Sequence, residues 1–236
     1  MKILAFDMTG MRLTVGAAED SQVLGRWDAP ASRERGNTLD SLIDRALADL
    51  QWQRTDIEGL ALATGPGSLT ATRIGWATAS GWSLAGGIPV TGWPTPEIQR
   101  RWWQDHGLDG NPLPHLTAER KPPVYCMIHH RGDEFYCYAI ERGKREVSTP
   151  TVARLGEWQP PTSNPAWIVG PGVLGFRERW IGTLSGRVEV ASEEQAIVGG
   201  DQLAQWGITD LAAGRYLSVS ESPLDYGLPP QFRKAL

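Results

Sequence analysis

The segment best suited to bind a ligand is the turn Gly65-Pro66-Gly67-Ser68, which follows an apolar run and precedes a long helix-forming run. Glycines allow a tight turn with exposed backbone amides, and the helix dipole adds positive charge where the helix begins. An anion could therefore bind there. No Lys-Ser or Lys-Thr follows, so the turn is not a Walker loop. An ordinary strand-to-helix turn capped by Ser68 fits the same residues.

Asp7 is a second candidate, because it ends an uninterrupted apolar run typical of a buried strand. A carboxylate there could hold a metal-bound phosphate, although Asp is also a common first residue of turns. Arg73 is the only charged residue between Ser68 and Gly86. Together these features define a candidate anion- or nucleotide-binding site. Its predicted residues are Asp7, Gly65, Gly67, Ser68 and Arg73.

No catalytic residue or metal site is predicted. His129 and His130 are adjacent on a predicted strand, so their side chains point to opposite faces and cannot share a metal unaided. Cys126 and Cys137 lie on the two arms of a predicted hairpin and could face each other across it, so a disulfide is conceivable. Two cysteines in a chain of this length nevertheless favour a reducing compartment.

The elements that position these residues are predicted to form two units. Each unit begins with a hairpin and mixes strands with helices, and this pattern predicts a duplicated α/β architecture. We expect a first domain over 1–105 and a second over 106–236, with a helix at 201–213 that could return to pack on the first. In the first domain, strands are expected within 2–27, 57–63 and 89–93, and helices at 35–50, 69–85 and 95–105. A loop is expected over 107–123, followed by a hairpin of 124–129 and 134–140 and strands at 152–158, 166–169 and 187–191.

The helix predicted over 69–85 is unusual because it has no charged face. A surface helix normally keeps one, so a helix that lacks it is covered on more than one side. Burial within the monomer and contact with another protein both remain open, and we favour contact with another protein. One face would carry Thr70, Ile74, Ala77, Gly81 and Leu84, and the neighbouring face Ala71, Gly75, Thr78, Ala79 and Trp82.

The composition excludes several classes of protein. The 236 residues carry a net charge of -4, which argues against autonomous nucleic-acid binding. Charged residues or glycine interrupt every apolar stretch before about 18 residues, so a soluble, cytoplasmic protein is expected. The 11 Trp outnumber Tyr and Phe together, and Trp76 and Trp82 lie beside the small-residue face of the helix predicted over 69–85.

Three segments, taken in order, resemble the TsaB family, also called YeaZ, the bacterial partner of the threonylcarbamoyl transferase TsaD. They are the opening Met1–Asp7, the run Gly65–Gly75 with its Gly-Pro-Gly-Ser-Leu-Thr-x-x-Arg-Ile-Gly pattern, and Ile128–Tyr136. The similarity covers nearly the whole chain, and the Gly-Pro-Gly helix is its specific part.

This resemblance implies an actin-like fold of the acetate-and-sugar-kinase (ASKHA, ribonuclease H-like) type, with two lobes and mixed central sheets. It implies a non-catalytic subunit that pairs with TsaD and with the ATPase TsaE, or with itself as a homodimer, and that meets tRNA only through the complex. The assembly would modify the adenosine beside the anticodon. No cofactor of its own is implied, and ATP or ADP at the partner interface is left open. The implied interface residues are Ala71, Gly75, Trp76, Thr78, Ala79 and Trp82.

The chain also departs from the family pattern. Ala71 replaces a usual glycine, Trp76-Ala77 brings bulk beside the expected interface, and His129-His130 replace Asp-Ala in the second-lobe hairpin. The last change removes the second carboxylate of an actin-like nucleotide site. Two alternatives therefore stay open: a small-molecule kinase of the same superfamily that would use Asp7, and a divergent homodimer without TsaD binding.

Overall fold

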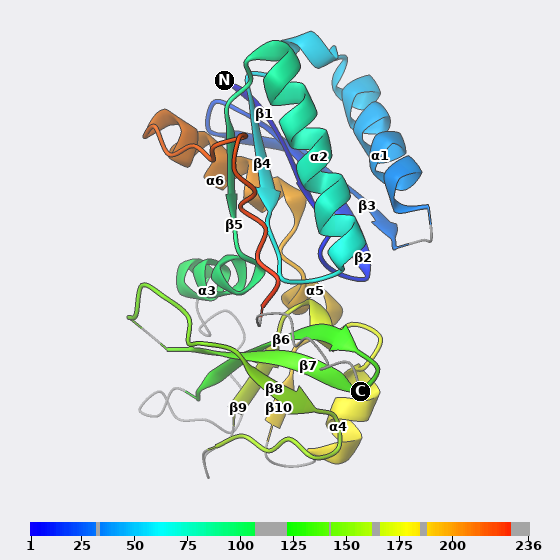
Figure 1. Ribbon diagram of the computed structural model, residues 1–236, viewed down its shortest axis with the longest axis vertical. Helices are drawn as coiled ribbons and strands as arrows, with labels where there is room; N and C mark the ends of the chain where they lie inside the picture. Colours follow the sequence, from blue (N-terminus) through cyan, green and yellow to red (C-terminus); the bar gives the residue numbers. More distant parts are fainter. Residues whose placement is uncertain (32–33, 107–121, 142, 162–165, 185–187, 228–236) are drawn as a thin grey trace, which may run out of the picture.

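Two five-stranded sheets, one above the other in Figure 1, organise the chain. The structure is a computed structural model, and it describes residues 1–31, 34–106, 122–141, 143–161, 166–184 and 188–227. The loop expected over 107–123 and the first residue of the strand expected at 187–191 fall largely outside these ranges. No helix in the described part is long and apolar enough to cross a membrane.

The first sheet has the strand order β3-β2-β1-β4-β5. Its antiparallel half is β1 (Lys2–Asp7), β2 (Arg12–Glu19) and β3 (Gln22–Pro30). β4 (Gly59–Ala63) and β5 (Val90–Trp93) extend it as parallel strands. The sequence explains this mixed sheet. Short turns join β1, β2 and β3, which makes them antiparallel, whereas a helix lies between β4 and β5, and parallel neighbours need such a crossover.

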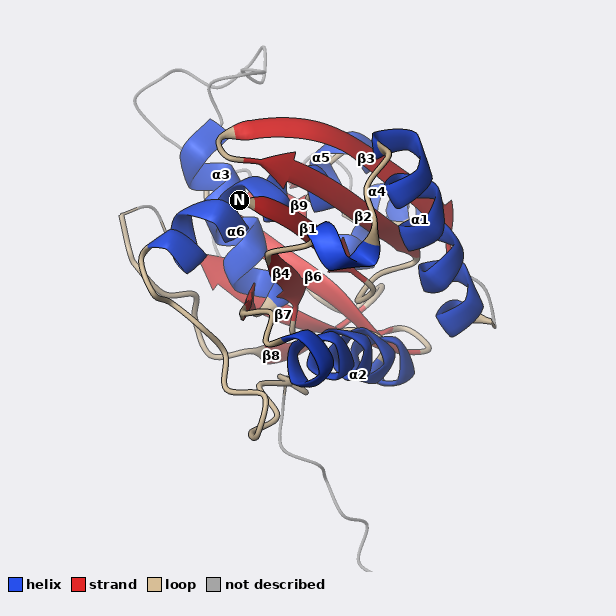
Figure 2. Cartoon of the chain, turned by 90° about the horizontal axis from the view of Figure 1, so that it is seen from above, coloured by secondary structure: helices blue, strands red, loops and turns tan. Residues whose placement is uncertain are grey.

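Helices cover both faces of the first sheet, and the two-residue side-chain period of β1 shows which side each takes. Leu4 and Phe6 belong to the apolar cluster that contains residues of α1 (Arg35–Leu50) and α2 (Leu69–Gly86). Ile3 and Ala5 belong to the cluster on the other face, with α3 (Thr95–His106) and α6 (Gly200–Ala212). Figure 2 shows α1 and α2 on one side of β1 and α6 on the other.

Helix α6 comes from the end of the chain and packs on the first sheet. Gly16 and Gly200 allow this, because a Cβ on Gly16 would lie 1.9 Å from the backbone carbon of Gly200. The Gly200 amide donates to Thr14 Oγ1 at 2.9 Å and fixes the start of the helix. Helix α3 also contacts the second half of the chain, since Gln99 Nε2 donates to the Ala196 carbonyl at 3.1 Å and the ring centroids of Trp103 and Trp167 lie 5.6 Å apart.

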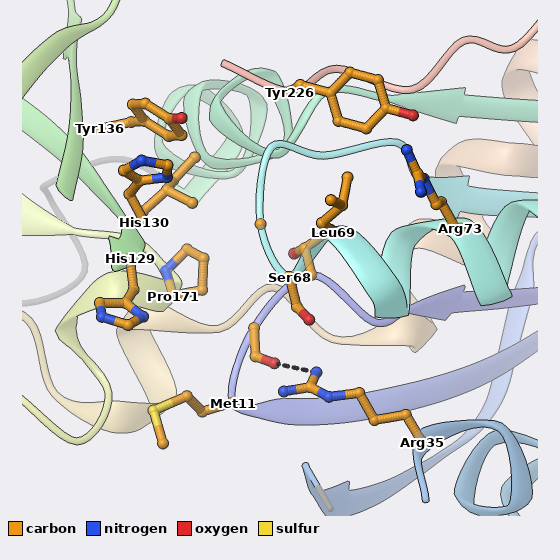
Figure 3. Close-up of a pocket in the computed structure, with 14 residues that line it drawn as sticks. Met11, Arg35, Ser68, Leu69, Arg73, His129, His130, Tyr136, Pro171 and Tyr226 are labelled. Carbon is orange, nitrogen blue, oxygen red and sulfur yellow. Dashed lines mark hydrogen bonds between the residues drawn. The ribbon is translucent and has the colours of Figure 1, made fainter. Parts of the chain in front are cut away.

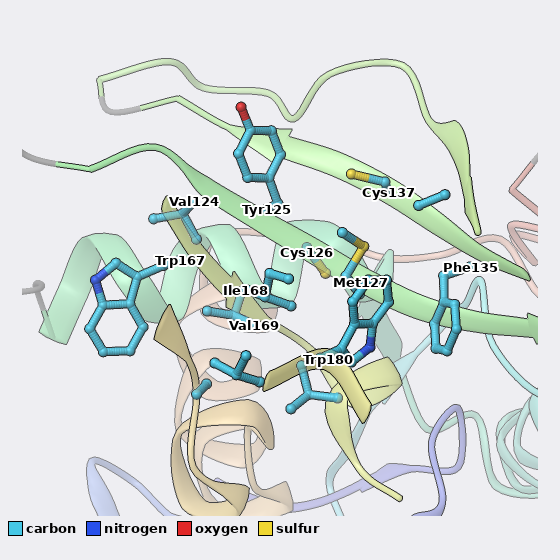
Figure 4. Close-up of a cluster of buried hydrophobic side chains, with 14 of the residues drawn as sticks. Val124, Tyr125, Cys126, Met127, Phe135, Cys137, Trp167, Ile168, Val169 and Trp180 are labelled. Atoms are coloured by element: carbon cyan, nitrogen blue, oxygen red, sulfur yellow. The ribbon is translucent and has the colours of Figure 1, made fainter. Parts of the chain in front are cut away.

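The second sheet has the order β10-β9-β6-β7-β8 and an aromatic core (Figure 4). Its strands are β6 (Val124–Arg131), β7 (Glu134–Ile140), β8 (Thr151–Arg154), β9 (Ala166–Val169) and β10 (Val188–Val190). The short helices α4 (Arg177–Thr183) and α5 (Glu193–Ala196) were not expected from the sequence. Trp180 of α4 is fully buried, and its ring centroid lies 5.0 Å from that of Phe135. Such edge contacts anchor α4 on the sheet.

The hairpin register does not place Cys126 and Cys137 opposite each other, as the disulfide left open above would require. Cys137 lies opposite Met127, and Cys126 lies opposite Tyr138. The turn is Gly132-Asp133, and a bulge before Arg131 shifts the pairing by one residue. A one-residue shift in register turns a side chain to the other face. Both cysteines are free, and both are buried.

Candidate functional site

The turn Gly65–Ser68 is held against the first hairpin turn of the chain. The Ser68 amide donates to the Thr9 carbonyl at 2.9 Å, and a Cβ on Gly67 would lie 2.5 Å from that same oxygen. Only glycine permits this approach, so Gly67 is needed for packing. Ser68, however, makes no side-chain cap, contrary to expectation. Its backbone carbonyl instead accepts from the Thr72 amide and the Thr72 hydroxyl.

Helix α2 turns the small-residue face expected at the partner interface toward the chain's own core. Ala71 and Ala79 are 0% exposed, and a Cβ on Gly75 would meet Met8 Sδ at 3.5 Å and Phe6 Cε2 at 3.6 Å. These three residues therefore cannot touch a second protein while the helix stays packed. The physical reason is that Phe6 and Met8 supply the bulk on this side, and small helical residues let the helix approach them.

Three other residues of the implied interface lie at the edges of this buried face. Trp76, Thr78 and Trp82 are half-buried. Both tryptophans pack against the α1–α2 core cluster, and the Arg54 guanidinium lies 5.3 Å from the Trp82 ring centroid. Most of their apolar surface is thus used within the first lobe.

The exposed face of α2 is the neighbouring one, and it is almost free of charge. Leu69 is 49% exposed and Leu84 is 75% exposed, and Arg73 is the one charged side chain on this face. A solvated helix face normally carries several charges, so this face has the composition of a contact surface. We call it the outer face of α2, and its exposed residues are Leu69, Thr70, Arg73, Ala77, Gly81, Leu84, Ala85 and Gly86.

A cavity of about 670 Å³ opens between the two lobes at the start of α2 (Figure 3). The first lobe supplies Thr9, Gly10, Met11, Arg35, Gly67, Ser68, Leu69 and Arg73. The second lobe supplies Ile128, His129, His130, Tyr136 and Pro171, and the C-terminal segment adds Tyr226. Its size is that of a small-molecule site. The lobes meet beneath it, where a Cβ on Gly10 would lie 3.0 Å from Pro171 Cβ.

The lining contains two arginines, two histidines and no carboxylate among the described residues. Arg35, at the start of α1, donates to the Gly10 carbonyl at 3.2 Å, and burial lowers the pKa of its guanidinium. Arg73 lies across from it, with its guanidinium 5.8 Å from the Tyr226 ring centroid. Burial and the nearby Arg131 lower the pKa of His130. The two guanidiniums are therefore the charged groups of the described lining, in a chain of net negative charge.

Three of the five residues predicted for an anion site reach this cavity, namely Gly67, Ser68 and Arg73. Asp7 and Gly65 do not line it. The Asp7 carboxylate accepts the Thr9 amide at 2.7 Å, and burial raises the pKa of that carboxyl. Gly65 has φ +99° and is covered by the C-terminal segment, since a Cβ on it would lie 2.4 Å from the Asp225 carbonyl oxygen.

The sequence reasoning missed Arg35, Tyr136 and Tyr226 as site residues. Nothing local marks Arg35, which begins an ordinary amphipathic helix. Tyr226 lies in the irregular segment after α6, where no local pattern marks it. Within the described ranges, no three His, Cys, Asp or Glu side chains come together in a way that could hold a metal ion.

Comparison with known proteins gives matches in sequence and in structure. Residues 29–97 match the family model of TsaD, tRNA N6-adenosine threonylcarbamoyltransferase. A protein of that name from Clostridium botulinum is 26% identical over 123 residues, which cover 50% of this chain and 32% of the relative. An uncharacterized protein of Mycobacterium tuberculosis is 33% identical over 92 residues, or 38% of this chain and 44% of that protein. The chain thus spans about a third of the length of the transferase it matches.

The structural match extends much further along the chain than the sequence matches do. YeaZ from Pseudomonas aeruginosa superimposes with a TM-score of 0.66 at 18% identity, covering 95% of this chain and 99% of that one. The expected two-lobed, actin-like α/β fold is therefore confirmed. The resemblance to TsaB (YeaZ) holds in fold along nearly the whole chain, and residues 29–97 carry the sequence pattern of the TsaD family.

Proposed function

We propose that the chain is a non-catalytic subunit of a tRNA threonylcarbamoyladenosine-modifying complex, and that it docks and orders a TsaD-type transferase. The observation that carries this proposal is the outer face of α2, a long helix surface with a single charge. The fold of YeaZ and the TsaD-like pattern of residues 29–97 support it, because that segment contains α1, β4, α2 and β5. A partner of the same fold could present an equivalent helix to this face.

A non-catalytic role is supported by the lining of the interlobe cavity. Kinases and ATPases hold their phosphate-bound metal with carboxylates. The described lining has none, and Asp7 points to the Thr9 amide instead. The chain would act by positioning its partner. A TsaE-type ATPase and the tRNA would join through the assembly, and a homodimer through the same outer face would form in the absence of the partner.

The docking step is tested by adding charge to the outer face. In Ala77→Arg and Gly81→Arg the new side chain points outward, since both positions are exposed and no atom lies within 4 Å of a Cβ on Gly81. The matched control is Ala212→Arg, an exposed alanine at the end of α6 on the opposite side of the first sheet. Affinity for the TsaD-type protein of the same organism is measured by calorimetry, and complex mass by light scattering.

We expect both outer-face variants to bind at least a hundredfold more weakly, with Ala212→Arg like the wild type. Equal binding by all four proteins would refute docking through this face. Loss of self-association with intact binding to the transferase would assign the face to a homodimer alone. Titration with Mg-ATP separates the kinase alternative, because micromolar binding with slow hydrolysis by the isolated chain would contradict a non-catalytic role.

A further inference from the structure

Residues 214–227 follow α6 and run along the first lobe as far as the second lobe. They contain no helix or strand, so their path depends on contacts with the rest of the chain. Figure 1 shows the segment in orange to red, passing from α6 down toward the second sheet. We call it the C-terminal strap. Docking of a transferase on the outer face of α2 does not use it.

The base of the strap, residues 215–219, is anchored on the first lobe. Arg215 donates to the Asp210 carboxylate at 2.5 Å, and the Leu217 amide donates to the Val90 carbonyl of β5 at 2.7 Å. Leu217 and Val219 pack against the α1–α2 core cluster. Because burial of apolar surface is the main favourable contribution to folding, these two side chains hold the base in place.

The tip of the strap, residues 225–227, touches both lobes. The Asp225 amide donates to the Thr64 carbonyl of the first lobe at 2.9 Å. Gly227 lies against the second lobe, since a Cβ on it would be 2.7 Å from Tyr136 Cε2. The Gly227 amide donates to Asp225 Oδ1 at 2.7 Å, and its φ of +79° favours glycine. Glycine is therefore needed at 227 both for the turn and for the approach to the ring.

Two tyrosines of β7 present the second lobe to the tip. Tyr136 and Tyr138 are two residues apart on one strand, so their side chains lie on the same face. The Tyr138 hydroxyl is buried and has no hydrogen-bond partner in the described part of the chain. Burial, and then the negative charge of Asp225, raise the pKa of Tyr138. The carboxylate at the tip thus interacts with the second lobe as well.

The tip lies at one rim of the interlobe cavity. Tyr226 lines the cavity, and Figure 3 shows Tyr226 and Tyr136 at the top of the view, with Pro171 and Met11 below them. The lobes touch on that lower side, where a Cβ on Gly10 would lie 3.0 Å from Pro171 Cβ. When two lobes touch on one side of a cleft, a tie on the opposite side limits how far a hinge motion can open it.

We propose that the C-terminal strap is a clamp, whose seated tip holds the two lobes at their present spacing and whose release lets the interlobe cavity widen. The tip is the part that releases. Its hydrogen bond to Thr64 and the contact of Gly227 with a ring bury little apolar surface, whereas the base buries Leu217 and Val219. The clamp needs no partner protein, so its test does not depend on the docking proposal.

The test measures the spacing of the lobes in the full chain. Spin labels are attached at Ala48→Cys on α1 and Val152→Cys on β8, because both positions are exposed. The two native cysteines are buried and so are protected from labelling. Pulsed electron paramagnetic resonance gives the distribution of distances between the labels. An excess of unlabelled chain removes distances between copies.

Two variants release the tip from opposite sides. Gly227→Ala places a methyl group 2.7 Å from the Tyr136 ring, at a φ that alanine rarely adopts. Asp225→Pro removes the amide that donates to the Thr64 carbonyl. The matched control is Gly214→Ala, because Gly214 has a similar φ of +71° on the same strap but no atom within 4 Å of its Cβ.

We expect both tip variants to lengthen the mean distance between the labels and to broaden its distribution at least twofold, with Gly214→Ala like the wild type. Hydrogen exchange of the backbone amides at the tip should become at least tenfold faster in the same two variants. Circular dichroism should show the native fold throughout, because the base and the cores are unchanged. A wild-type distance distribution in both tip variants would overturn the proposal, and so would broadening that appears only with loss of the native fold.

Discussion

The two faces of α2 are alike in composition and opposite in environment. Ala71, Gly75 and Ala79 on the inner face are covered by the sheet, whereas Ala77 and Gly81 on the outer face are exposed. Both faces are rich in small, uncharged residues, so composition alone cannot say which of them meets a partner. The difference arises from Phe6 and Met8, whose side chains fill the space under one face only. A stripe of small residues therefore indicates close packing but does not identify what is packed.

The strongest test of this comparison introduces the same charge on each face. Ala79→Arg would bury a guanidinium with no partner, and we expect it to lower the free energy of unfolding by more than about 4 kcal/mol. Ala77→Arg, two residues earlier on the exposed side, should change it by less than about 0.5 kcal/mol. Urea denaturation followed by circular dichroism measures both. Similar losses in the two variants would show that the faces are not distinct.

A second test removes apolar surface from the outer face without adding charge. Leu84 is 75% exposed, so Leu84→Ala should leave the unfolding transition unchanged. If Leu84 is covered by the transferase, the affinity should fall by about 1–2 kcal/mol, as for an apolar contact at an interface. Calorimetry against the transferase checks this. The control is Val152→Ala, because Val152 is also an exposed apolar residue but lies on β8 in the second lobe. An unchanged affinity would restrict the interface to the first turns of α2.

A third change should strengthen the inner face. A Cβ on Gly75 would find its nearest neighbours at 3.5 Å and 3.6 Å, which is ordinary contact, so an alanine fits there. Gly75→Ala should raise the free energy of unfolding by about 0.5–1 kcal/mol, because glycine is a poor helix former. Thermal unfolding measures the gain, and binding to the transferase should not change. Loss of partner binding in this more stable variant would mean that Gly75 is reached from outside.

The smallest effect is expected at the edge between the two faces. Arg54→Gln removes the cation above the Trp82 ring, an exposed contact for which about 0.5 kcal/mol is typical. We also expect the fluorescence of Trp82 to change, and to change again when the transferase binds if the outer face is covered. Trp82→Phe is the control, because the chain has 11 Trp and only the difference from this variant isolates the Trp82 signal. An identical spectrum before and after complex formation would place the partner away from this edge.

Periodicity in the sequence was enough to find most elements. The helix expected at 35–50 is α1 with the same bounds, and the helix expected at 69–85 extends one residue further as α2. The strand expected at 152–158 ends earlier, at Arg154, because a turn follows it. The helices α4 and α5 were not predicted because they are short. A segment of four to seven residues is too short to show a helical period.

The candidate site was harder to predict because its residues are far apart in the chain. Gly67, Ser68 and Arg73 could be found from one local motif, which marks the start of a helix. Arg35 and Tyr226 could not, since each lies in an unremarkable segment and reaches the cavity only when the lobes fold together. The pairing of the β6–β7 hairpin could not be predicted either. A single bulge before Arg131 sets its register, and this decides which residues lie opposite Cys126 and Cys137.

The sequence by itself determined the order of the elements, the uncharged character of α2 and the resemblance to TsaB, because local periodicity and motifs are carried by neighbouring residues. The tertiary structure alone decided which face of α2 is free and which side chains line the cavity. Both depend on what packs against a segment from elsewhere in the chain: Phe6 and Met8 under α2, and the second lobe opposite Arg35 and Arg73.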